Sequence, residues 1–207
     1  EYHEGDAIIG IDVEIAQAIA EKLGMELHIE DMAFDAIIPS VVSGKADIGL
    51  AAISYDEDRA ASVNFSENYA TSSLVILVAE GSEIASADDL EGKLIGAQTG
   101  TTGEMTATDM VGDENVERYN SYFEAVQSLL TGKIDAVIID NAPAQEYVSA
   151  NADAGLTILD GAWVEEQYCA AVDEGNEALL NAINTALNEL IEDGTVQTII
   201  DKYITAD

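Results

Sequence analysis

Apolar residues recur at helical spacing in two long segments of the chain. Ile15, Ile19 and Leu23 stand four residues apart, and this spacing predicts an amphipathic helix over Ile11–Leu23. The second segment lies near the carboxyl end and has apolar residues at Leu179, Leu180, Ile183, Leu187, Leu190 and Ile191. Gly194 follows these residues and predicts the end of the second helix.

Short apolar runs elsewhere in the chain predict β-strands. These runs cover Ile48–Ile53, Ser73–Val78, Lys93–Ala97, Val116–Tyr119, Ala136–Ile139, Leu156–Leu159 and Tyr168–Val172. Apolar and polar residues alternate around His28, which predicts one more strand. The runs at Ile48–Ile53 and Ala136–Ile139 are apolar on both faces, a pattern typical of parallel strands covered by helices. Because strands and helices alternate along the chain, the predicted fold class is α/β.

One stretch of the chain occurs twice in similar form. The segment FDAIIPSVVSGKADIGLAAI starts at Phe34, and FEAVQSLLTGKIDAVIID starts at Phe123. Both predict helix, turn and buried strand, with Gly44 and Gly132 where a helix end favours a left-handed residue. The repeat indicates two similar α/β halves. The alternative is that helix-glycine-strand units recur by convergence in α/β folds.

Strand segments rather than a flexible tether are expected to join the two halves. The sequence has only two prolines and no Ser/Pro-rich linker. Val75–Ala79 and Tyr168–Val172 are the segments at which we expect the chain to cross between the halves.

The composition indicates a globular protein with a strongly acidic surface. Among 207 residues, 48% are hydrophobic, which is enough to bury a core. Seven Lys and Arg against 41 Asp and Glu give a formal charge of −34. Phosphate binding needs clustered basic residues, so nucleic acid is excluded as an expected partner, and an anionic membrane surface would repel the chain. The acidic residues are interpreted as a solvated surface that keeps the protein soluble.

Neither a membrane segment nor a secretion signal is expected in this sequence. No apolar run approaches the roughly 20 residues that span a bilayer, and no basic segment followed by an apolar one stands at the amino end. The single cysteine, Cys169, excludes an internal disulfide.

Motifs for hydrolysis and for zinc binding are absent from the sequence. No G-x-S-x-G occurs, and neither His3 nor His28 belongs to an H-E-x-x-H motif or a Cys/His cluster. We therefore expect no catalytic residue, no metal and no cofactor.

The segment IGAQTGTTGE, Ile95 to Glu104, runs from a predicted strand through a glycine-rich turn into a predicted helix. It lacks the Lys of a Walker loop and the glycine spacing of a dinucleotide fingerprint, so it does not predict a nucleotide site. A helix N-terminus with glycine in front of it can still hold a carboxylate. The alternative is that Thr101 or Thr102 simply caps the helix.

Arg59 is one of only two arginines, and the other is Arg118. A planar guanidinium binds a carboxylate through two parallel hydrogen bonds, which makes Arg59 a candidate ligand-binding residue. The alternative is that Arg59 neutralises the acidic residues of its own turn, Asp56, Glu57 and Asp58.

Several candidate residues stand where predicted strands end. Asp140 ends the apolar run of the second repeat, and Ser54 follows that of the first. Ligands of open α/β sheets bind beyond the carboxyl ends of the strands. We therefore expect Asp140, Ser54 and the Thr101–Thr102 turn to meet in a cleft between two lobes.

Five segments of the chain carry a resemblance to a known family. In order, they read GIDVEIAQAIAEKLG, FDAIIPSVVSGKADI, SYDEDRAASVNFSENY, IGAQTGTTGE and GKIDAVIIDNAPA. Together they resemble the extracytoplasmic amino-acid-binding proteins of ABC transporters, in the polar-amino-acid family. The resemblance implies the two-lobed type II periplasmic-binding-protein fold with a two-strand hinge. Lobe 1 is expected over 1–79 and 168–207 and lobe 2 over 80–167, and the family's first strand is expected to be missing.

The same resemblance implies roles for individual residues. In that family an Arg five residues after a Ser or Thr holds the ligand α-carboxylate, which matches Arg59 and Ser54. The Gly-Thr-Thr turn, with Thr101 and Thr102, shares this carboxylate, and Asp140 matches the residue that takes the α-ammonium.

Two further positions match the family pattern, and two depart from it. Phe34 corresponds to an aromatic that stacks on the ligand, and Asp12 to an acid that faces the side-chain pocket. Ala52 stands where many relatives have Gly or Ser, and Asp56 replaces the usual Thr before the Arg.

The resemblance implies a function without catalysis. We expect the protein to capture a free amino acid with a neutral or cationic side chain and deliver it to an ABC transporter permease. It would work outside the cytoplasm, in the periplasm or lipid-anchored at the cell surface. The alternatives are the sensory domain of a receptor and a dehydratase on the same fold.

Overall fold

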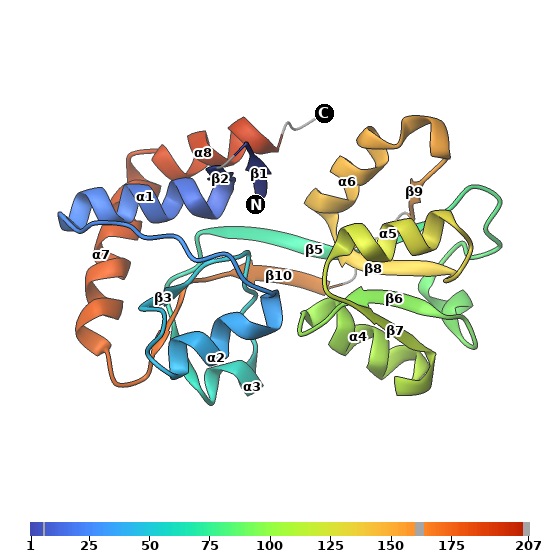
Figure 1. Cartoon of the computed structure of the whole chain (residues 1–207), viewed down its shortest axis with the longest axis horizontal. Coiled ribbons are helices and arrows are strands. Elements are labelled where there is room, and N and C mark those ends of the chain that lie inside the picture. Colours follow the sequence, from blue (N-terminus) through green and yellow to red (C-terminus); the bar gives the residue numbers. More distant parts are fainter. Residues whose placement is uncertain (6, 160–163, 205–207) are drawn as a thin grey trace. The chain divides into compact units, whose positions relative to one another are not determined.

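The chain folds into two compact α/β units in a computed structural model that describes residues 1–5, 7–159 and 164–204 (Figure 1). Unit 1 comprises Glu1–Met32, Ala36–Thr71 and Gln167–Asp207, and unit 2 comprises Ala33–Asp35 and Ser72–Glu166. Both long crossings lie in strands, after Thr71 and after Glu166. The lobe limits expected from the sequence, after residue 79 and after residue 167, both lie closer to the carboxyl end than these crossings.

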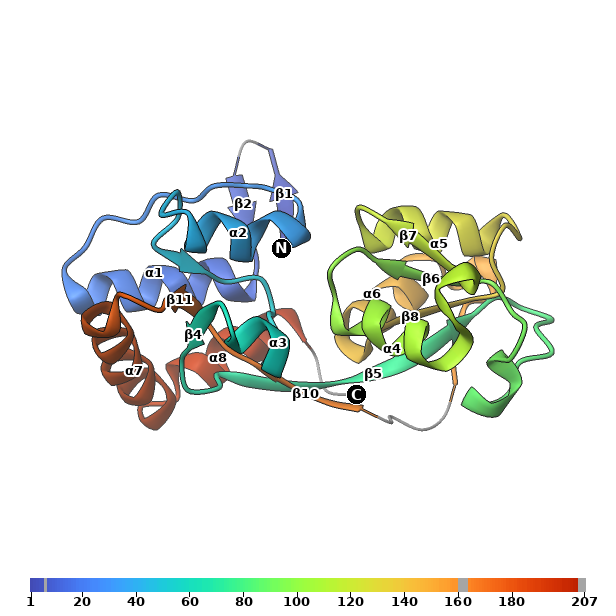
Figure 2. The same cartoon turned by 90° about the horizontal axis from the view of Figure 1, so that it is seen from below.

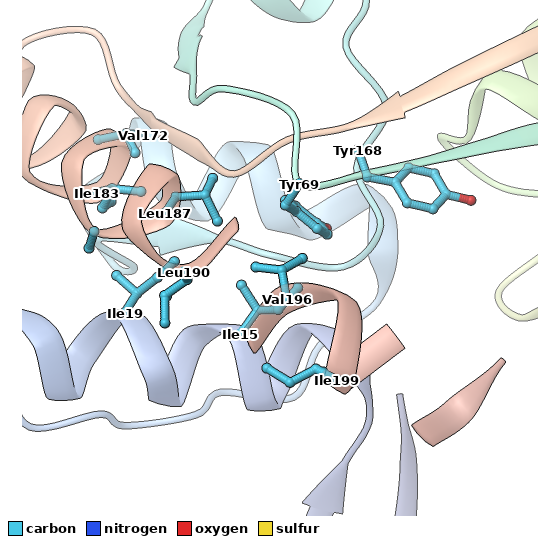
Figure 3. Packing of buried hydrophobic residues seen from close by; sticks show 11 residues of the cluster. Ile15, Ile19, Tyr69, Tyr168, Val172, Ile183, Leu187, Leu190, Val196 and Ile199 are labelled. Atoms are coloured by element: carbon cyan, nitrogen blue, oxygen red, sulfur yellow. The ribbon is translucent and has the colours of Figure 1, made fainter. Parts of the chain in front are cut away.

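Three helices of unit 1 enclose its main apolar cluster (Figure 3). They are α1 (Ile11–Leu23), α7 (Glu177–Glu192) and α8 (Thr195–Tyr203). Ile15 and Ile19 of α1 pack with Leu187 of α7 and with Tyr69. The predicted helix Ile11–Leu23 is therefore confirmed to the residue, because its apolar stripe has a buried partner surface.

A small antiparallel sheet completes the core of unit 1, in the order β3-β11-β4. Its strands are β3 (Ile48–Gly49), β4 (Val63–Phe65) and β11 (Ala171–Asp173). The helix α2 (Ile37–Val42) packs closely on β3, since a Cβ on Gly49 would lie 2.8 Å from Cγ2 of Ile37. The hairpin of β1 (Tyr2–Glu4) and β2 (Ala7–Ile9) and the short helix α3 (Glu57–Ala60) complete the unit. The short helix η1 (Phe34–Ala36) begins in the Ala33–Asp35 segment of unit 2 and ends in unit 1.

Unit 2 is built on a mixed sheet with the order β10-β5-β8-β6-β7, and β9 pairs with β5 beside this path. The strands are β5 (Ala70–Val78), β6 (Ile95–Gln98), β7 (Val116–Tyr119), β8 (Ala136–Asp140), β9 (Thr157–Ile158) and β10 (Val164–Tyr168). Its helices are α4 (Thr102–Val111), α5 (Tyr122–Leu130), α6 (Asn141–Ala150), η2 (Ala87–Leu90), η3 (Asp113–Asn115) and η4 (Ala152–Ala154).

Helices cover both faces of the unit 2 sheet (Figure 2). Alternate residues of β8 separate into two clusters, with Ile138 packing on the side of α4 and Ile139 on the side of α5 and α6. This double burial explains why the run Ala136–Ile139 is apolar throughout.

The two repeated segments end their helices in the same way. Gly44 and Gly132 have φ of 69° and 68°, in the left-handed region. Lys45 N donates to Ser40 O, as Lys133 N donates to Ser128 O, and both glycines donate to the carbonyl three residues earlier. These are two Schellman motifs. Helix, turn and strand follow one another in both copies as predicted, although the first strand covers only Ile48–Gly49 of the predicted Ile48–Ile53.

The predicted direction of the first repeated strand was wrong. β3 is only two residues long and pairs antiparallel with β11, whereas β8 is parallel to β6 and antiparallel to β5. An apolar run reports burial on both faces and carries no information on strand direction. The chain leaves the sheet after Gly49, and Ala52 then takes a φ of 48°.

Two other strand predictions need correction. The segment around His28 forms no strand, and Met25 and Ile29 are 58% and 44% exposed. Alternation stabilises a strand only where one face is buried and a neighbour pairs with it. Tyr168–Val172 is divided between β10 and β11, which belong to different sheets, because the chain changes sheet at this point.

Candidate ligand-binding site

The Arg59 side chain is held inside unit 1 by the backbone of its own segment. Nη1 of Arg59 donates a 2.7 Å hydrogen bond to the carbonyl oxygen of Ser54, and Arg59 is only 8% exposed. A guanidinium has five N–H donors in a fixed plane, so this bond fixes the orientation of the whole group. The five-residue spacing of Ser54 and Arg59 thus allows the guanidinium to reach the Ser54 carbonyl.

One acidic neighbour of Arg59, Asp56, caps the helix that contains Arg59. Asp56 is the N-cap of α3, and its Oδ1 accepts hydrogen bonds from the backbone N–H groups of Asp58 at 2.9 Å and Arg59 at 3.1 Å. Both Asp and the more usual Thr are good N-cap residues, which explains this departure from the family pattern. Arg59 is buried, whereas Glu57 and Asp58 beside it are exposed to solvent.

Ser54 is buried at the point where the segment approaches the carboxyl-terminal part of unit 1. It forms an isolated antiparallel bridge with Tyr168, and Cys169 N donates a 2.9 Å hydrogen bond to Ile53 O. These backbone contacts tie the end of the 48–54 segment to the last residue of β10 and to Cys169, between β10 and β11. The carbonyl group that anchors Arg59 therefore belongs to a fixed part of the core.

Asp12 contacts the 48–54 segment through the backbone of Ala52. It is 3% exposed, and its Oδ2 accepts a hydrogen bond from the backbone N–H of Ala52. Ala52 is the one non-glycine residue with positive φ among the residues that the structure describes. Sequence reasoning missed this contact, since a backbone donor has no residue-type signature.

Burial changes the ionisation of Asp12. Its pKa is raised to about 7, first because the carboxyl is removed from water and second because of the negative charge of Glu1. The hydroxyl of Tyr69 and the N–H of Ala52 partly offset this rise in the pKa. Burial and the nearby Asp12 in turn raise the pKa of Tyr69 well above its usual value. Oδ1 of Asp12 and the hydroxyl of Tyr69 are both buried without a hydrogen bond of ordinary geometry.

In unit 2, the Gly-Thr-Thr turn begins α4. Thr101 is the N-cap: its hydroxyl accepts from Glu104 N at 3.2 Å and donates to Gln98 O at 2.8 Å. The capping interpretation is therefore confirmed for Thr101. Thr102 is the first residue of the helix, where backbone N–H groups have no partner within the helix.

Asp140 lies at the same edge of the unit 2 sheet as this turn. β6 and β8 are adjacent and parallel, with Gly96 opposite Val137, so their carboxyl ends meet at one edge. A Cβ on Gly103 would lie 3.1 Å from Ile138 O, which shows how closely the start of α4 approaches the end of β8. The structure thus brings the Thr101–Thr102 turn and Asp140 together.

Asp140 does not use its side chain to cap the helix that follows it. It occupies the N-cap position of α6 but makes no side-chain capping bond there. Phe34, the remaining expected residue, is half-buried at the start of η1.

Arg118, the second arginine, forms ion pairs within unit 2. It donates from Nε to Oε1 of Glu104 and from Nη2 to Oδ1 of Asp113, each at 2.6 Å. These bonds raise the pKa of Arg118 further above its usual value. Oε2 of Glu104 also accepts from Gly100 N at 2.6 Å, so Arg118 helps to hold the turn before Thr101.

Each unit contains groups that can bind part of an amino acid. Unit 1 offers a buried, oriented guanidinium, while unit 2 offers a helix N-terminus and a carboxylate at a strand end. No group of three or more His, Cys, Asp and Glu that could hold a metal occurs in 1–5, 7–159 and 164–204. Among the same residues, no helix is both long and apolar enough to cross a bilayer. That all these groups face one ligand stays a prediction.

Comparison with known proteins gives matches along the whole chain. The model of the family described as bacterial extracellular solute-binding proteins, family 3, matches residues 1–206. The arginine-binding extracellular protein ArtP of Bacillus subtilis (strain 168) is 31% identical over 209 residues, which cover 100% of this chain and 82% of that protein.

Solved structures match equally well. The arginine-, lysine-, histidine-binding protein ArtJ of Geobacillus stearothermophilus has a TM-score of 0.94 at 31% identity, over 100% of this chain and 90% of that one. An ancestral arginine-binding protein in its arginine-bound structure has a TM-score of 0.92 at 39% identity, over 97% and 90% of the two chains. An ancestral arginine-binding protein has also been solved bound to glutamine.

Proposed function

Because this chain belongs to the bacterial extracellular solute-binding proteins of family 3, we propose that it captures a free amino acid and delivers it to the permease of an ABC transporter. The resemblance carried by the five sequence segments is confirmed by this membership, as is the type II periplasmic-binding-protein fold. The family consists of solute-binding proteins, so the protein is not an enzyme and the dehydratase alternative is set aside.

The observation that carries the proposal is the setting of Arg59. Arg59 is buried, and a planar guanidinium in such a setting is suited to binding a carboxylate. The bond from Nη1 to Ser54 O orients the plane of the group, as bidentate binding of a carboxylate requires. We assign the α-carboxylate of the amino acid to Arg59, with Ser54 as the residue that positions it.

Unit 2 contributes the groups that complete recognition of a zwitterion. Thr102 and the N–H groups at the start of α4 favour the same carboxylate, because the helix N-terminus carries a partial positive charge. Asp140 takes the α-ammonium, because it ends β8 at the same edge of the sheet as the Thr101–Thr102 turn. Phe34 is assigned to the face of the ligand side chain.

The protein works outside the cytoplasm, in keeping with the extracellular character of its family. We propose that it is either free in the periplasm or held at the cell surface by a lipid. Partitioning of the native protein between detergent and aqueous phases distinguishes these two forms.

A thermal-shift screen against the twenty common amino acids tests the proposed function. A ligand at 100 times its Kd stabilises the folded state by about 2.7 kcal/mol, which for a chain of this size raises Tm by roughly 5–10 °C. We expect such a shift for at least one amino acid and none for the corresponding amine without a carboxylate. Arg59→Ala is the matched control, and it should melt as the free protein does but show no shift. No shift with any amino acid would contradict the proposal.

A further inference from the structure

We infer that Asp12 is a positioning residue that holds Ala52 in its left-handed conformation and thereby places the Ser54 carbonyl that orients Arg59. This inference rests on the proposed function of Arg59. It assigns Asp12 an indirect role in ligand binding, through the backbone, in place of the contact with the ligand side chain that the family resemblance implies.

The first step is the strain at Ala52. Its φ of 48° is unfavourable for a residue with a Cβ, and such a conformation persists only where the surroundings enforce it. The hydrogen bond from Ala52 N to Oδ2 of Asp12 is the contact that enforces it. Asp12 itself is fixed, because it lies near the beginning of α1 and is almost fully buried.

The second step leads from Ala52 to Arg59. Ser54 follows Ala52 by two residues and forms its bridge to Tyr168, while Ser54 O accepts the bond from Nη1 of Arg59. A change of φ at Ala52 redirects the chain that follows it, so it moves the Ser54 carbonyl. The orientation of the guanidinium plane therefore depends on the contact between Asp12 and Ala52.

The third step concerns the charge on Asp12. Its carboxyl faces Glu1 and the hydroxyl of Tyr69, and the ring centroids of Tyr69 and Tyr168 are 6.4 Å apart. An ionised carboxylate is a stronger acceptor than the protonated acid. With a pKa of about 7, Asp12 holds Ala52 most firmly above neutral pH. Ligand affinity should consequently fall as the pH is lowered from about 8 to about 6.

The decisive experiment compares Asp12→Ala with the double variant Asp12→Ala, Ala52→Gly. Glycine adopts a positive φ without steric cost, so a turn with glycine in place of Ala52 keeps its shape without Asp12. We expect Asp12→Ala to weaken amino-acid binding roughly tenfold, because the backbone strain of one left-handed residue corresponds to about a tenfold change in Kd. Adding Ala52→Gly should restore most of the affinity. Asp12→Asn, with the same rescue, replaces Asp12→Ala if the latter does not fold.

Two controls accompany this comparison. Ala52→Gly alone gives the reference affinity against which the double variant is compared. Glu14→Gln removes another carboxylate from the first turn of α1, one that bonds Lys202 and Tyr203 at the surface, and it should also leave the affinity unchanged. Wild-type affinity in Asp12→Ala, or a loss that Ala52→Gly does not restore, would overturn the positioning role.

A readout without ligand separates this inference from the proposed function. The backbone amide of Ala52 should shift with pH in NMR spectra of the free protein, with a midpoint at the Asp12 pKa of about 7, and should not do so in Asp12→Asn. A flat titration in the wild type would overturn the inference even if the protein binds amino acids. A wild type that binds no amino acid contradicts the proposed function, while the amide titration still decides whether Asp12 holds this turn.

Discussion

The carboxylate of Asp12 accepts a hydrogen bond from the backbone N–H of Ala52, although 40 residues separate them along the chain. This buried contact joins the start of α1 to the segment that carries Ser54 and Arg59. It places an ionisable group in the interior of unit 1, with consequences for stability as well as for binding.

Asp12 makes the stability of the protein depend on pH. Its pKa is near 3.8 in the unfolded chain and about 7 in the folded protein, so the folded state binds the proton more tightly. This contribution to stability is complete below pH 3.8 and is lost as the pH rises to about 7. Relative to Asp12→Asn, the wild type should lose on the order of 1 kcal/mol of stability per pH unit across this window. Urea melts from about pH 4.5 to about pH 8 measure the difference.

Glu14 provides a control of opposite sign. Its bonds to Lys202 and Tyr203 lower its pKa in the folded protein, so its contribution is present above the unfolded pKa and is lost as the pH falls. Glu14→Gln should thus differ from the wild type most at neutral pH.

The Asp12 prediction has a clear contradicting outcome. If the free energies of unfolding of the wild type and Asp12→Asn change in parallel with pH, Asp12 is not buried as described.

The two threonines of the α4 turn should respond differently to replacement. Thr101→Val removes the N-cap hydroxyl and its bond to Gln98 O, so unfolding should become easier by about 1 kcal/mol. Thr102→Val leaves the cap intact and should change stability by less than roughly 0.5 kcal/mol, yet weaken amino-acid binding. Denaturant melts and calorimetric titrations of both variants check this. A Thr101→Val variant as stable as the wild type would contradict the capping role.

Gly44 and Gly132 should be equivalent in their energetic cost. Both have positive φ, and a Cβ on either would meet nothing within 4 Å, so only backbone strain opposes a side chain. Gly44→Ala and Gly132→Ala should each destabilise the protein by about 1–2 kcal/mol. The Asn variants should cost less, because Asn tolerates the left-handed region better. Unequal losses in denaturant melts would show that the two repeats end differently.

Helices and their ends were largely predictable from the sequence. The limits of Ile11–Leu23, the glycine caps of the repeat and the N-cap at Thr101 all follow from spacing and residue type within a few positions. These features are local, so a window of sequence contains most of what determines them.

Strand pairing was less predictable because it depends on distant residues. Nothing around His28 indicates that this alternating segment finds no partner, and nothing within Tyr168–Val172 indicates a change of sheet. The site shows the same limit. The candidacy of Arg59 was predictable from the sequence, but the buried contact of Asp12 with a strained Ala52 depends on the tertiary fold.

Ligands with neutral or cationic side chains should bind more tightly than acidic ones. The chain carries a formal charge of −34, which repels anions, and Arg118 is paired with Glu104 and Asp113. Arginine and glutamine should therefore bind better than glutamate in calorimetry, and the difference should shrink in high salt, which screens the overall field. Tighter binding of glutamate than of glutamine would contradict this prediction.

The most direct test of the account is a calorimetric comparison of one amino acid with its carboxamide, using the wild type, Arg59→Lys and Arg59→Ala. If Arg59 binds the α-carboxylate, the wild type should prefer the acid, and both variants should lose about 2–5 kcal/mol of binding, which is roughly thirty-fold to several thousand-fold in Kd. The preference should vanish in Arg59→Ala, while Arg118→Lys retains it. Unchanged affinity in both Arg59 variants, or the same preference for the acid in Arg59→Ala as in the wild type, would contradict the central claim.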